Sequence, residues 1–262
     1  MNVNILAIGD VAGETGVGIL SDKLRGVKKY YDAAFTVVNG ENAAGLGVTK
    51  DQARAIFDAG ADVITLGNHT WRRREIFTFL DDNLNILRPA NFAPQTPGRG
   101  WGIFEAPFGR VCVINLIGRN GMDENNDNPF FEVDRILKSE ALQGEDIKIT
   151  LVDFHAEMTS EKYAFIYHLD GRVSAVWGTH THVQTSDCHV FKGGTGYITD
   201  LGMTGAQESI IGMKPDRPLS RFLGNPPERF EPATGPAKIE GAVFEIDADS
   251  GKCRSVEAIR II

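Results

Sequence analysis

The residues best suited to metal binding or catalysis follow strand-like stretches of the chain, at the point where each stretch ends. His180 and His182 are the clearest case, because they come two residues apart just after the apolar stretch 173–177. Side chains at positions i and i+2 of an extended chain lie on the same side, so both imidazoles can enter one pocket. Such a pair also occurs in ordinary surface loops, so its interpretation depends on the rest of the sequence.

Other polar residues take the same position after four further strand-like stretches. Asp10 follows 3–8, Glu41 and Asn42 follow 34–38, Asn68 and His69 follow 62–66, and His155 follows 147–153. The carboxyl ends of parallel strands meet at one edge of a sheet, and ligands bind at that edge. We therefore expect these side chains to gather in one site.

Strands and helices alternate along the chain, and this alternation is what must position the site. Besides the strands already named, including 173–177, helices are predicted at 16–30, between Thr49 and Gly60, at 72–81, from Pro129 to 141 and at 160–169. Thr49 is the expected N-cap and Gly60 the expected C-cap of the second helix. The alternation predicts an α/β fold with parallel strands joined by right-handed crossovers.

The remaining segments are predicted to be loops and hairpins. Turn-rich loops are expected at 88–102 and 118–128, hairpins at 101–106 with 110–116 and at 238–247 with 252–261, and short strands near 188–192 and 195–199. Residues 201–236 hold many Gly and Pro and few strand signals, which fits either a lid or a contact between subunits. Because no repeat or linker interrupts the pattern, residues 1–262 are expected to form a single domain.

Composition narrows the class of protein. The 262 residues are 42% hydrophobic, carry a net charge of -8 and have a pI near 5.3. An acidic surface repels polyanions, so long nucleic acid is a poor candidate partner. The sequence has neither a signal-peptide pattern nor an apolar stretch of about 20 residues, so no membrane association is expected. Three cysteines without a CxxC motif favour a cytoplasmic location, with Cys112 as a small buried strand residue.

The candidate ligands mix carboxylate, amide and imidazole groups and include no thiolate. They are Asp10, Glu41, Asn42, Asn68, His155, His180 and His182. Mn, Fe or Zn suits such a set, and seven ligands fit two divalent ions if Glu41 bridges them. Two ions about 3.5 to 4 Å apart can hold an attacking hydroxide and grip phosphoryl oxygens. His69, next to Asn68, is suited to protonate a leaving alkoxide.

Together these motifs resemble the calcineurin-like metallophosphoesterase superfamily. The motifs are Gly9-Asp10, Gly67-Asn68-His69, a single His155, and Gly178-Thr179-His180-Thr181-His182. The chain departs from the superfamily pattern twice, because Ala12 replaces the histidine of Asp-x-His and Glu41-Asn42 replaces the bridging Asp of Gly-Asp. Both departures are similar to one bacterial subfamily, the YmdB-like phosphodiesterases, and the resemblance spans nearly the whole chain.

The resemblance implies a fold, a site and an activity. The fold would be a four-layer sandwich of two mixed β-sheets flanked by α-helices. Asp10, Glu41, Asn42 and His182 would hold one metal, and Glu41, Asn68, His155 and His180 the other, with Fe or Mn favoured and Zn an alternative. Asn42 would replace the absent histidine, and His69 would be the general acid. The activity would be hydrolysis of phosphodiesters, including 2',3'- and 3',5'-cyclic nucleotides, by a self-associating enzyme.

Plainer interpretations stand beside several motifs. Asp10 also fits a helix cap, and Asn39-Gly40 fits a simple turn. Asp153 or Glu157 could orient an imidazole, although we expect one of them to be only a surface residue. His168 and His189 are predicted to be structural, and Arg72-Arg73-Arg74 favour a solvated helix face over phosphate binding. Gly13, Gly16 and Gly18 stand in the wrong order for a dinucleotide fingerprint.

Two other functions fit the same residues. A phosphomonoesterase of the 5'-nucleotidase kind would use the same metal centre, and its preference for mono- over diesters would distinguish it. A nucleotide-binding regulatory protein with little turnover would use residues 201–236 as a partner interface. In that case an Asp10→Ala variant would keep its biological effect.

Overall fold

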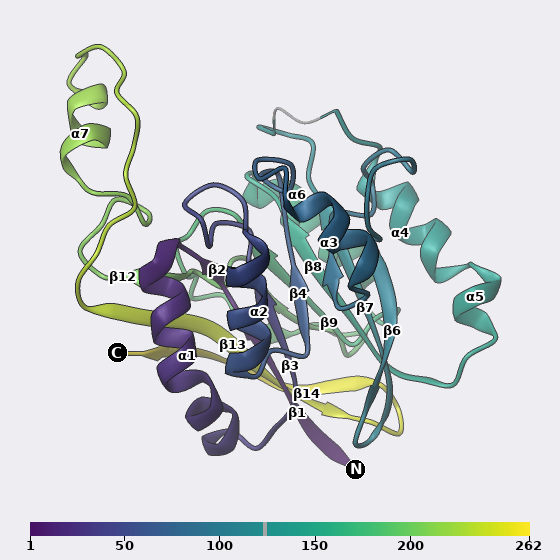
Figure 1. Ribbon diagram of the computed structural model, residues 1–262. Coiled ribbons are helices and arrows are strands. Elements are labelled where there is room, and N and C mark those ends of the chain that lie inside the picture. The colour runs from purple at the N-terminus through teal and green to yellow at the C-terminus, as the bar shows by residue number, and fades with distance from the viewer. Residues whose placement is uncertain (123–124) are drawn as a thin grey trace.

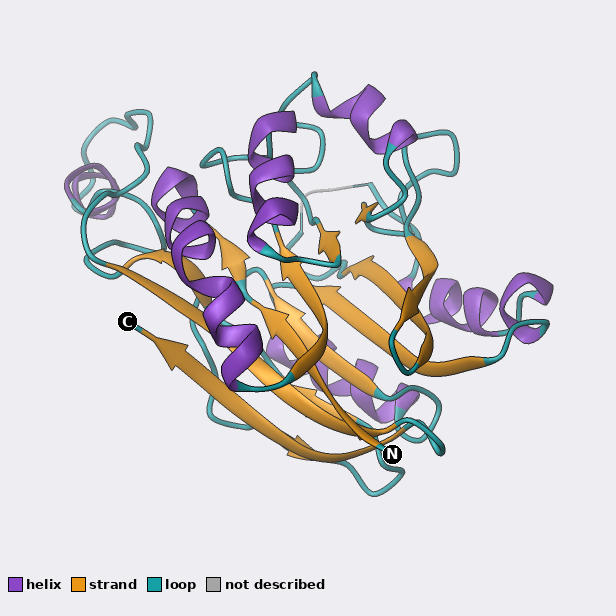
Figure 2. Ribbon diagram, turned by 60° about the horizontal axis from the view of Figure 1, so that its bottom comes forward, coloured by secondary structure: helices purple, strands orange, loops and turns teal. Residues whose placement is uncertain are grey.

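Two mixed β-sheets lie face to face, with helices on the outer side of each, in a computed structural model that describes residues 1–122 and 125–262 (Figures 1 and 2). Part of the loop predicted at 118–128, namely residues 123–124, lies outside the described residues. Along the described ranges, no helix has the length and apolarity that crossing a membrane would require.

The first sheet has the strand order β2-β12-β13-β1-β3-β4-β5, with β14 paired to β13. Its strands are β1 (Asn2–Ile8), β2 (Asp10–Val11), β3 (Ala33–Asn39), β4 (Val63–Thr65), β5 (Ile86–Leu87), β12 (Met203–Ala206), β13 (Ala237–Asp247) and β14 (Lys252–Ile261). β1, β3, β4 and β5 run parallel, whereas β13 is antiparallel to β1, β12 and β14. The first and last parts of the chain therefore share one sheet.

The second sheet has the order β10-β11-β9-β8-β7-β6. Its strands are β6 (Trp101–Ala106), β7 (Gly109–Ile117), β8 (Ile147–His155), β9 (Ala175–Thr179), β10 (His189–Val190) and β11 (Gly196–Ile198). β7, β8, β9 and β11 are parallel, and β6 and β10 are antiparallel edge strands. The carboxyl ends of β8 and β9 carry the predicted histidines.

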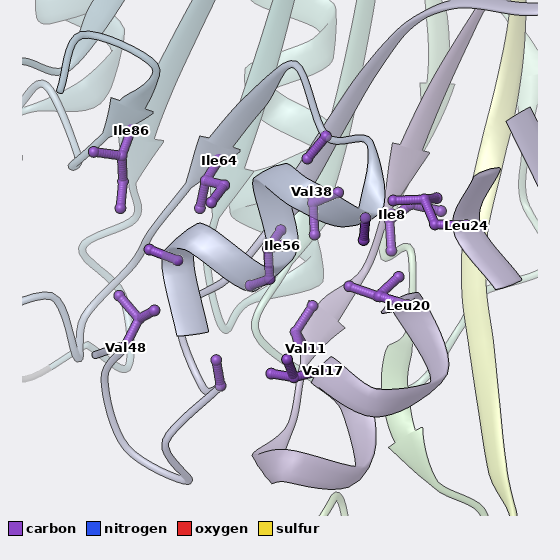
Figure 3. Close-up of a cluster of buried hydrophobic side chains, with 14 of the residues drawn as sticks. Ile8, Val11, Val17, Leu20, Leu24, Val38, Val48, Ile56, Ile64 and Ile86 are labelled. Atoms are coloured by element: carbon purple, nitrogen blue, oxygen red, sulfur yellow. The ribbon is translucent and has the colours of Figure 1, made fainter. Parts of the chain in front are cut away.

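Alternation along the strands of the first sheet builds two apolar layers. In β1, Leu6 and Ile8 face the helices α1 (Gly13–Tyr30) and α2 (Lys50–Ala59), while Ile5 and Ala7 face the second sheet. Figure 3 shows the helix side, where Ile8 lies near Leu20 and Leu24 of α1. Burial on both faces explains why these strands read as continuous apolar runs rather than as alternating ones.

The outer face of the second sheet is covered by the helices α4 (Pro129–Leu137) and α6 (Thr159–Leu169). Val133 and Ile136 of α4 and Phe165 of α6 belong to the same buried cluster as Phe154 of β8. The Phe154 and Phe165 rings stack 4.1 Å apart. Helix, sheet, sheet and helix layers follow one another, so the predicted four-layer sandwich is confirmed.

Several element boundaries agree with the prediction. Thr49 caps α2 through a capping box with Gln52, and Gly60 ends it in the left-handed region at a φ of 119°. Cys112 is fully buried in β7, and burial raises the pKa of its thiol to about 12. All three cysteines are free.

Other boundaries were predicted wrongly. The helix expected at 72–81 is α3 (Ile76–Asp82), because the chain after His69 first turns, with the Arg72 N–H donating to the His69 carbonyl. The helix expected from Pro129 to 141 ends at Leu137, and extended backbone at Ser139 separates it from α5 (Glu140–Gln143). β9 extends to Thr179 and β8 to His155, two residues beyond the predicted strand ends. α1 begins at Gly13 rather than at residue 16.

The segment predicted to have few strand signals contains β12 and the short helix α7 (Asp216–Phe222). We call residues 207–236 the arm. It projects from the body beyond β12 and β13 in Figure 1. The arm returns on itself, because Met213 bridges both Ile210 and Pro232.

Candidate metal centre

All seven predicted ligands come together where the carboxyl ends of strands from both sheets meet. The first sheet contributes Asp10 at the start of β2, Glu41 and Asn42 after β3, and Asn68 after β4, while the second sheet contributes His155 at the end of β8 and His180 and His182 after β9. Asp10, Glu41 and His155 are completely buried, and their ligand atoms lie within 4.8 Å of one another. The site thus joins the two sheets.

One group of donor atoms surrounds His155 Nε2. This nitrogen lies 2.6 Å from Glu41 Oε2, 3.0 Å from Asn68 Oδ1 and 3.0 Å from His180 Nδ1. These four side chains are the set that the sequence assigned to one metal. Two oxygens and one nitrogen therefore lie close to one ring nitrogen. A cation bound among these four atoms could be coordinated by all of them.

The second group surrounds His182 Nε2. Asp10 Oδ1 lies 3.7 Å from this nitrogen. The Asn42 amide donates its Nδ2–H to the same nitrogen at 3.1 Å, so the Asn42 oxygen faces His69 instead. The other oxygen of Asp10 accepts the backbone N–H of His180 at 3.1 Å. These side chains, together with Glu41, are the set assigned to the other metal.

The imidazole of His155 is held in one tautomer by a buried relay. Its Nδ1 lies 2.9 Å from Thr179 Oγ1, and the Thr179 hydroxyl donates to Asp153 Oδ1 at 2.8 Å. Because that hydroxyl proton is already used, Thr179 accepts the Nδ1–H of His155, and Nε2 keeps a free lone pair. Asp153 therefore orients the imidazole through Thr179 and is fully buried.

The other two imidazoles are oriented in the same manner by different acceptors. His182 Nδ1 lies 2.9 Å from the backbone carbonyl of Ile211, which can only accept, so Nδ1 carries the proton. His180 Nε2 lies 3.1 Å from the Glu157 carboxylate. In the His155 and His182 rings, the nitrogen that faces Glu41 or Asp10 is left unprotonated, which is the state a metal ligand needs. His180 Nδ1 faces His155 Nε2.

The buried carboxylates have oxygens that no protein group satisfies. Asp10 Oδ1 and Glu41 Oε2 are buried without a hydrogen-bond partner in the part of the chain that the structure describes. Burial raises the pKa of both carboxyls, and for Asp10 the nearby charges of Asp200 and Glu41 raise it further. Burial also lowers the pKa of His155, and that of His180 to about 3. Unpaired buried carboxylates beside neutral imidazoles fit divalent cations.

The backbone at the site is held in unusual conformations. His180 and His182 have φ values of 102° and 63°, in the left-handed region that costs a non-Gly residue about 1 to 3 kcal/mol. A buried ion pair holds the loop between them, because Lys162 Nζ donates to the Thr179 carbonyl at 2.9 Å and to Asp200 Oδ2 at 2.8 Å. The same Asp200 oxygen accepts the Thr181 N–H.

Close approach explains the glycine before Asn68. A Cβ atom at Gly67 would overlap Glu41 Oε2 and His155 Nε2. Only glycine lets the β4 loop pass the ligand cluster. Sequence reasoning used Gly67 as part of a motif and did not predict this contact.

His69 lies beside the ligands. Its Nδ1 is 2.9 Å from Asn42 Oδ1, and its backbone N–H donates to Glu41 Oε1. The side chain lines the same cavity as His180 and His182. His69 therefore lies beside the candidate ligands and lines the cavity, a position from which its side chain can contact a substrate.

The remaining histidines and the arginine run lie outside the cavity. His168 Nε2 is 2.9 Å from Asp134 Oδ1, and His189 stacks on Phe191 with ring centroids 4.5 Å apart. Arg73 donates to the Ala44 and Leu46 carbonyls and so fixes the loop after Glu41. Sequence reasoning missed Lys162, Asp200 and Ile211, because a buried lysine and a backbone carbonyl carry no motif.

Comparison with known proteins identifies the family of the chain. A family model described as YmdB-like protein matches residues 6–259. The Bacillus subtilis (strain 168) protein named 2',3'-cyclic-nucleotide 2'-phosphodiesterase is 44% identical over 260 residues, which cover 99% of this chain and 97% of the relative.

Two solved structures are similar over the whole chain. A hypothetical protein from Thermus thermophilus has a TM-score of 0.90 at 36% identity and covers 99% of each chain. A Mycoplasma pneumoniae protein described as a novel phosphatase has a TM-score of 0.92 at 33% identity, covering 100% of this chain and 94% of its own. The chain belongs to the YmdB-like family, within the calcineurin-like metallophosphoesterase superfamily of enzymes.

Proposed function

We propose that this enzyme is a dinuclear metal-dependent phosphodiesterase that hydrolyses small phosphodiesters, with cyclic nucleotides as substrates. The observation that carries the proposal is the orientation of three imidazoles. His155 and His182 each give one ring proton to an acceptor and turn the other nitrogen toward Glu41 and Asp10, respectively. His180 turns Nδ1 toward His155 Nε2 and places Nε2 beside Glu157. This arrangement supports two cation sites that share the Glu41 carboxylate.

Each residue has a role that follows from its position. Asp10, Asn42 and His182 would hold one ion, Asn68, His155 and His180 would hold the other, and both sites would share Glu41. Fe or Mn suits this mixture of ligands, and Zn is a third candidate. When bound, two such ions supply Lewis acidity that activates water and positive charge that stabilises phosphoryl oxygens. His69 lines the cavity at their edge and donates a proton to the leaving oxygen.

The choice of substrate rests on the relatives. The Bacillus subtilis relative is named for 2',3'-cyclic nucleotides, and at 44% identity we infer the same substrate class here, with 3',5'-cyclic nucleotides as a second group. The whole chain acts as one domain in this proposal, because β13 near its end pairs with β1 at its start and with β14. Three free cysteines support a cytoplasmic location.

A leaving-group comparison tests the proposal. The chain, reconstituted with Mn²⁺ or Fe²⁺, should bind two ions per chain by metal analysis and should hydrolyse 2',3'-cyclic AMP. His69→Ala should lower kcat on this substrate by about 10²- to 10⁴-fold, because the ribose oxygen needs a proton. The same variant should be far less affected on bis-p-nitrophenyl phosphate, because p-nitrophenolate leaves without protonation. His189→Ala is the matched control.

Two results would count against the proposal. Equal losses on both substrates would exclude His69 as the acid, and one ion per chain would exclude the dinuclear site. The phosphomonoesterase alternative draws support from the Mycoplasma pneumoniae structure described as a phosphatase. Faster hydrolysis of p-nitrophenyl phosphate than of its bis ester would favour that alternative.

A further inference from the structure

A cavity of about 600 Å³ opens over the candidate metal centre. His69, His180 and His182 line it, together with residues 45–46 and Glu157. Much of the remaining lining belongs to the arm, including Ile211, Arg221, Phe222 and Phe230. This volume is within the roughly 300–1,000 Å³ of small-molecule sites and is far larger than a phosphate group requires.

The base of the arm is attached to the metal centre itself. The Ile211 carbonyl accepts the Nδ1–H of His182. Ile211 has a φ of 45°, which a β-branched residue rarely adopts, so this contact is held against backbone strain. The Ala233 N–H donates to the Gly212 carbonyl at 2.8 Å, which holds the returning segment of the arm next to Ile211.

The wall that the arm presents is apolar and aromatic. Phe222 has 83% of its surface exposed, and Phe230 is half-buried. The Arg221 guanidinium carbon lies 5.9 Å from the centroid of the Phe230 ring. Contiguous apolar patches on a protein surface mark binding sites, and these aromatic side chains line the same cavity as His69.

We propose that Phe222, Phe230 and Arg221 form the nucleobase subsite of the enzyme. The inference rests on the proposed function. If the phosphorus of a diester lies at the metal centre, its organic group must extend into this cavity. A planar base can stack on an aromatic ring or a guanidinium group, and such stacking tolerates every base because each has a π-face.

The subsite makes the arm a determinant of substrate choice. A diester that carries a base contacts the arm wall, and one without a base does not. The enzyme should therefore favour 2',3'-cyclic AMP over glycerol 1,2-cyclic phosphate, which has the same five-membered cyclic ester. Because the stacking residues lie apart from the ligands, their loss should leave the hydrolysis of the base-free ester intact.

The experiment compares kcat/KM for these two esters in the metal-loaded enzyme. Wild type should prefer the nucleotide at least tenfold. Phe222→Ala with Phe230→Ala should lower kcat/KM for 2',3'-cyclic AMP about tenfold, equivalent to about 1.4 kcal/mol, mainly through KM, and should leave the glycerol ester within twofold. Leu219→Ala, on the same helix but outside the cavity lining, is the matched control.

The outcomes separate the subsite from the activity. No preference in wild type, or equal loss on both esters in the double variant, overturns the subsite and leaves the phosphodiesterase standing. Failure of wild type to hydrolyse either ester overturns the proposed function and the subsite with it. A double variant that instead changes the oligomeric state by analytical ultracentrifugation, with unaltered kinetics on both esters, assigns the aromatic face to a second copy and overturns the subsite.

Discussion

At the scale of single residues, the site depends on side chains that orient the candidate ligands. Thr179 is the best example, because its hydroxyl accepts from His155 Nδ1 and donates to Asp153 at the same time. The hydroxyl thus connects the buried Asp153 carboxylate to the imidazole. It contacts Nδ1 of the ring and leaves Nε2, the nitrogen that faces Glu41, free. Such indirect partners commonly contribute as much as a weak ligand does.

Thr179→Val removes this relay and keeps the shape of the side chain. We expect metal affinity to fall about 10- to 100-fold, because the His155 ring loses the acceptor that fixes its tautomer. Isothermal titration of Mn²⁺ into metal-free protein measures the change. Thr36→Val is the matched control, since the Thr36 hydroxyl is buried and has no hydrogen-bond partner among the described residues. Equal affinity in both variants would contradict the relay.

At the scale of elements, α6 supports the loop after β9. Lys162 extends from this helix through the core, has only 1% of its side chain exposed and reaches the Thr179 carbonyl and Asp200. The ion pair therefore links a helix, the end of β9 and the chain after β11. It holds the left-handed backbone at His180 and His182 in place, because Asp200 also accepts the Thr181 N–H.

Lys162→Met leaves the Asp200 charge buried and unpaired. We expect the free energy of unfolding to fall by about 3–5 kcal/mol, measured by urea denaturation of the metal-free protein. Combining it with Asp200→Asn should recover part of the loss, since the second change removes the unpaired charge. Lys148→Met, which removes the exposed pair with Asp146, should cost no more than about 1 kcal/mol. If Lys162→Met alone were as stable as the Lys162→Met, Asp200→Asn double variant, the ion pair would not have the proposed stabilising role.

At the scale of the whole molecule, the candidate ligands connect the two sheets. Asp10, Glu41 and Asn68 come from the first sheet, and His155 and His180 from the second. Burial raises the pKa of the Asp10 carboxyl, and the nearby charges of Asp200 and Glu41 raise it further. A cation that binds both sheets should therefore offset this repulsion and resist their separation.

Metal removal should accordingly destabilise the fold. At an ion concentration about 100 times Kd, binding to the folded state contributes about 2.7 kcal/mol, which corresponds to a Tm about 5–10 °C higher than that of the chelated protein. Differential scanning fluorimetry with EDTA, followed by Mn²⁺ addition, measures the shift. Glu41→Ala should abolish the response to Mn²⁺, because this carboxylate is the ligand that both proposed ion sites share. A response that persists in this variant would place the ion elsewhere.

The sequence by itself determined where the candidate ligands stand, because each lies at a strand end and strand ends are local features of the apolar pattern. Asp10, Glu41, Asn68, His155 and the 180/182 pair could all be found in this way. The alternation of elements predicted that they gather in one site, but not that the site draws on two sheets. Boundaries such as the start of α3 could not be found, since the turn after His69 depends on contacts with the loop beyond Glu41.

Only the tertiary structure decided what surrounds those ligands. The Ile211 carbonyl meets His182 across 29 positions, and Lys162 meets Thr179 across 17. A carbonyl is present at every residue, and lysines also lie on other helices such as α1 and α2. Neither pattern nor propensity therefore distinguishes the carbonyl and the lysine that contact the site. Lys162 reaches the site because α6 packs against the second sheet, and the Ile211 carbonyl reaches it because the arm returns along the cavity.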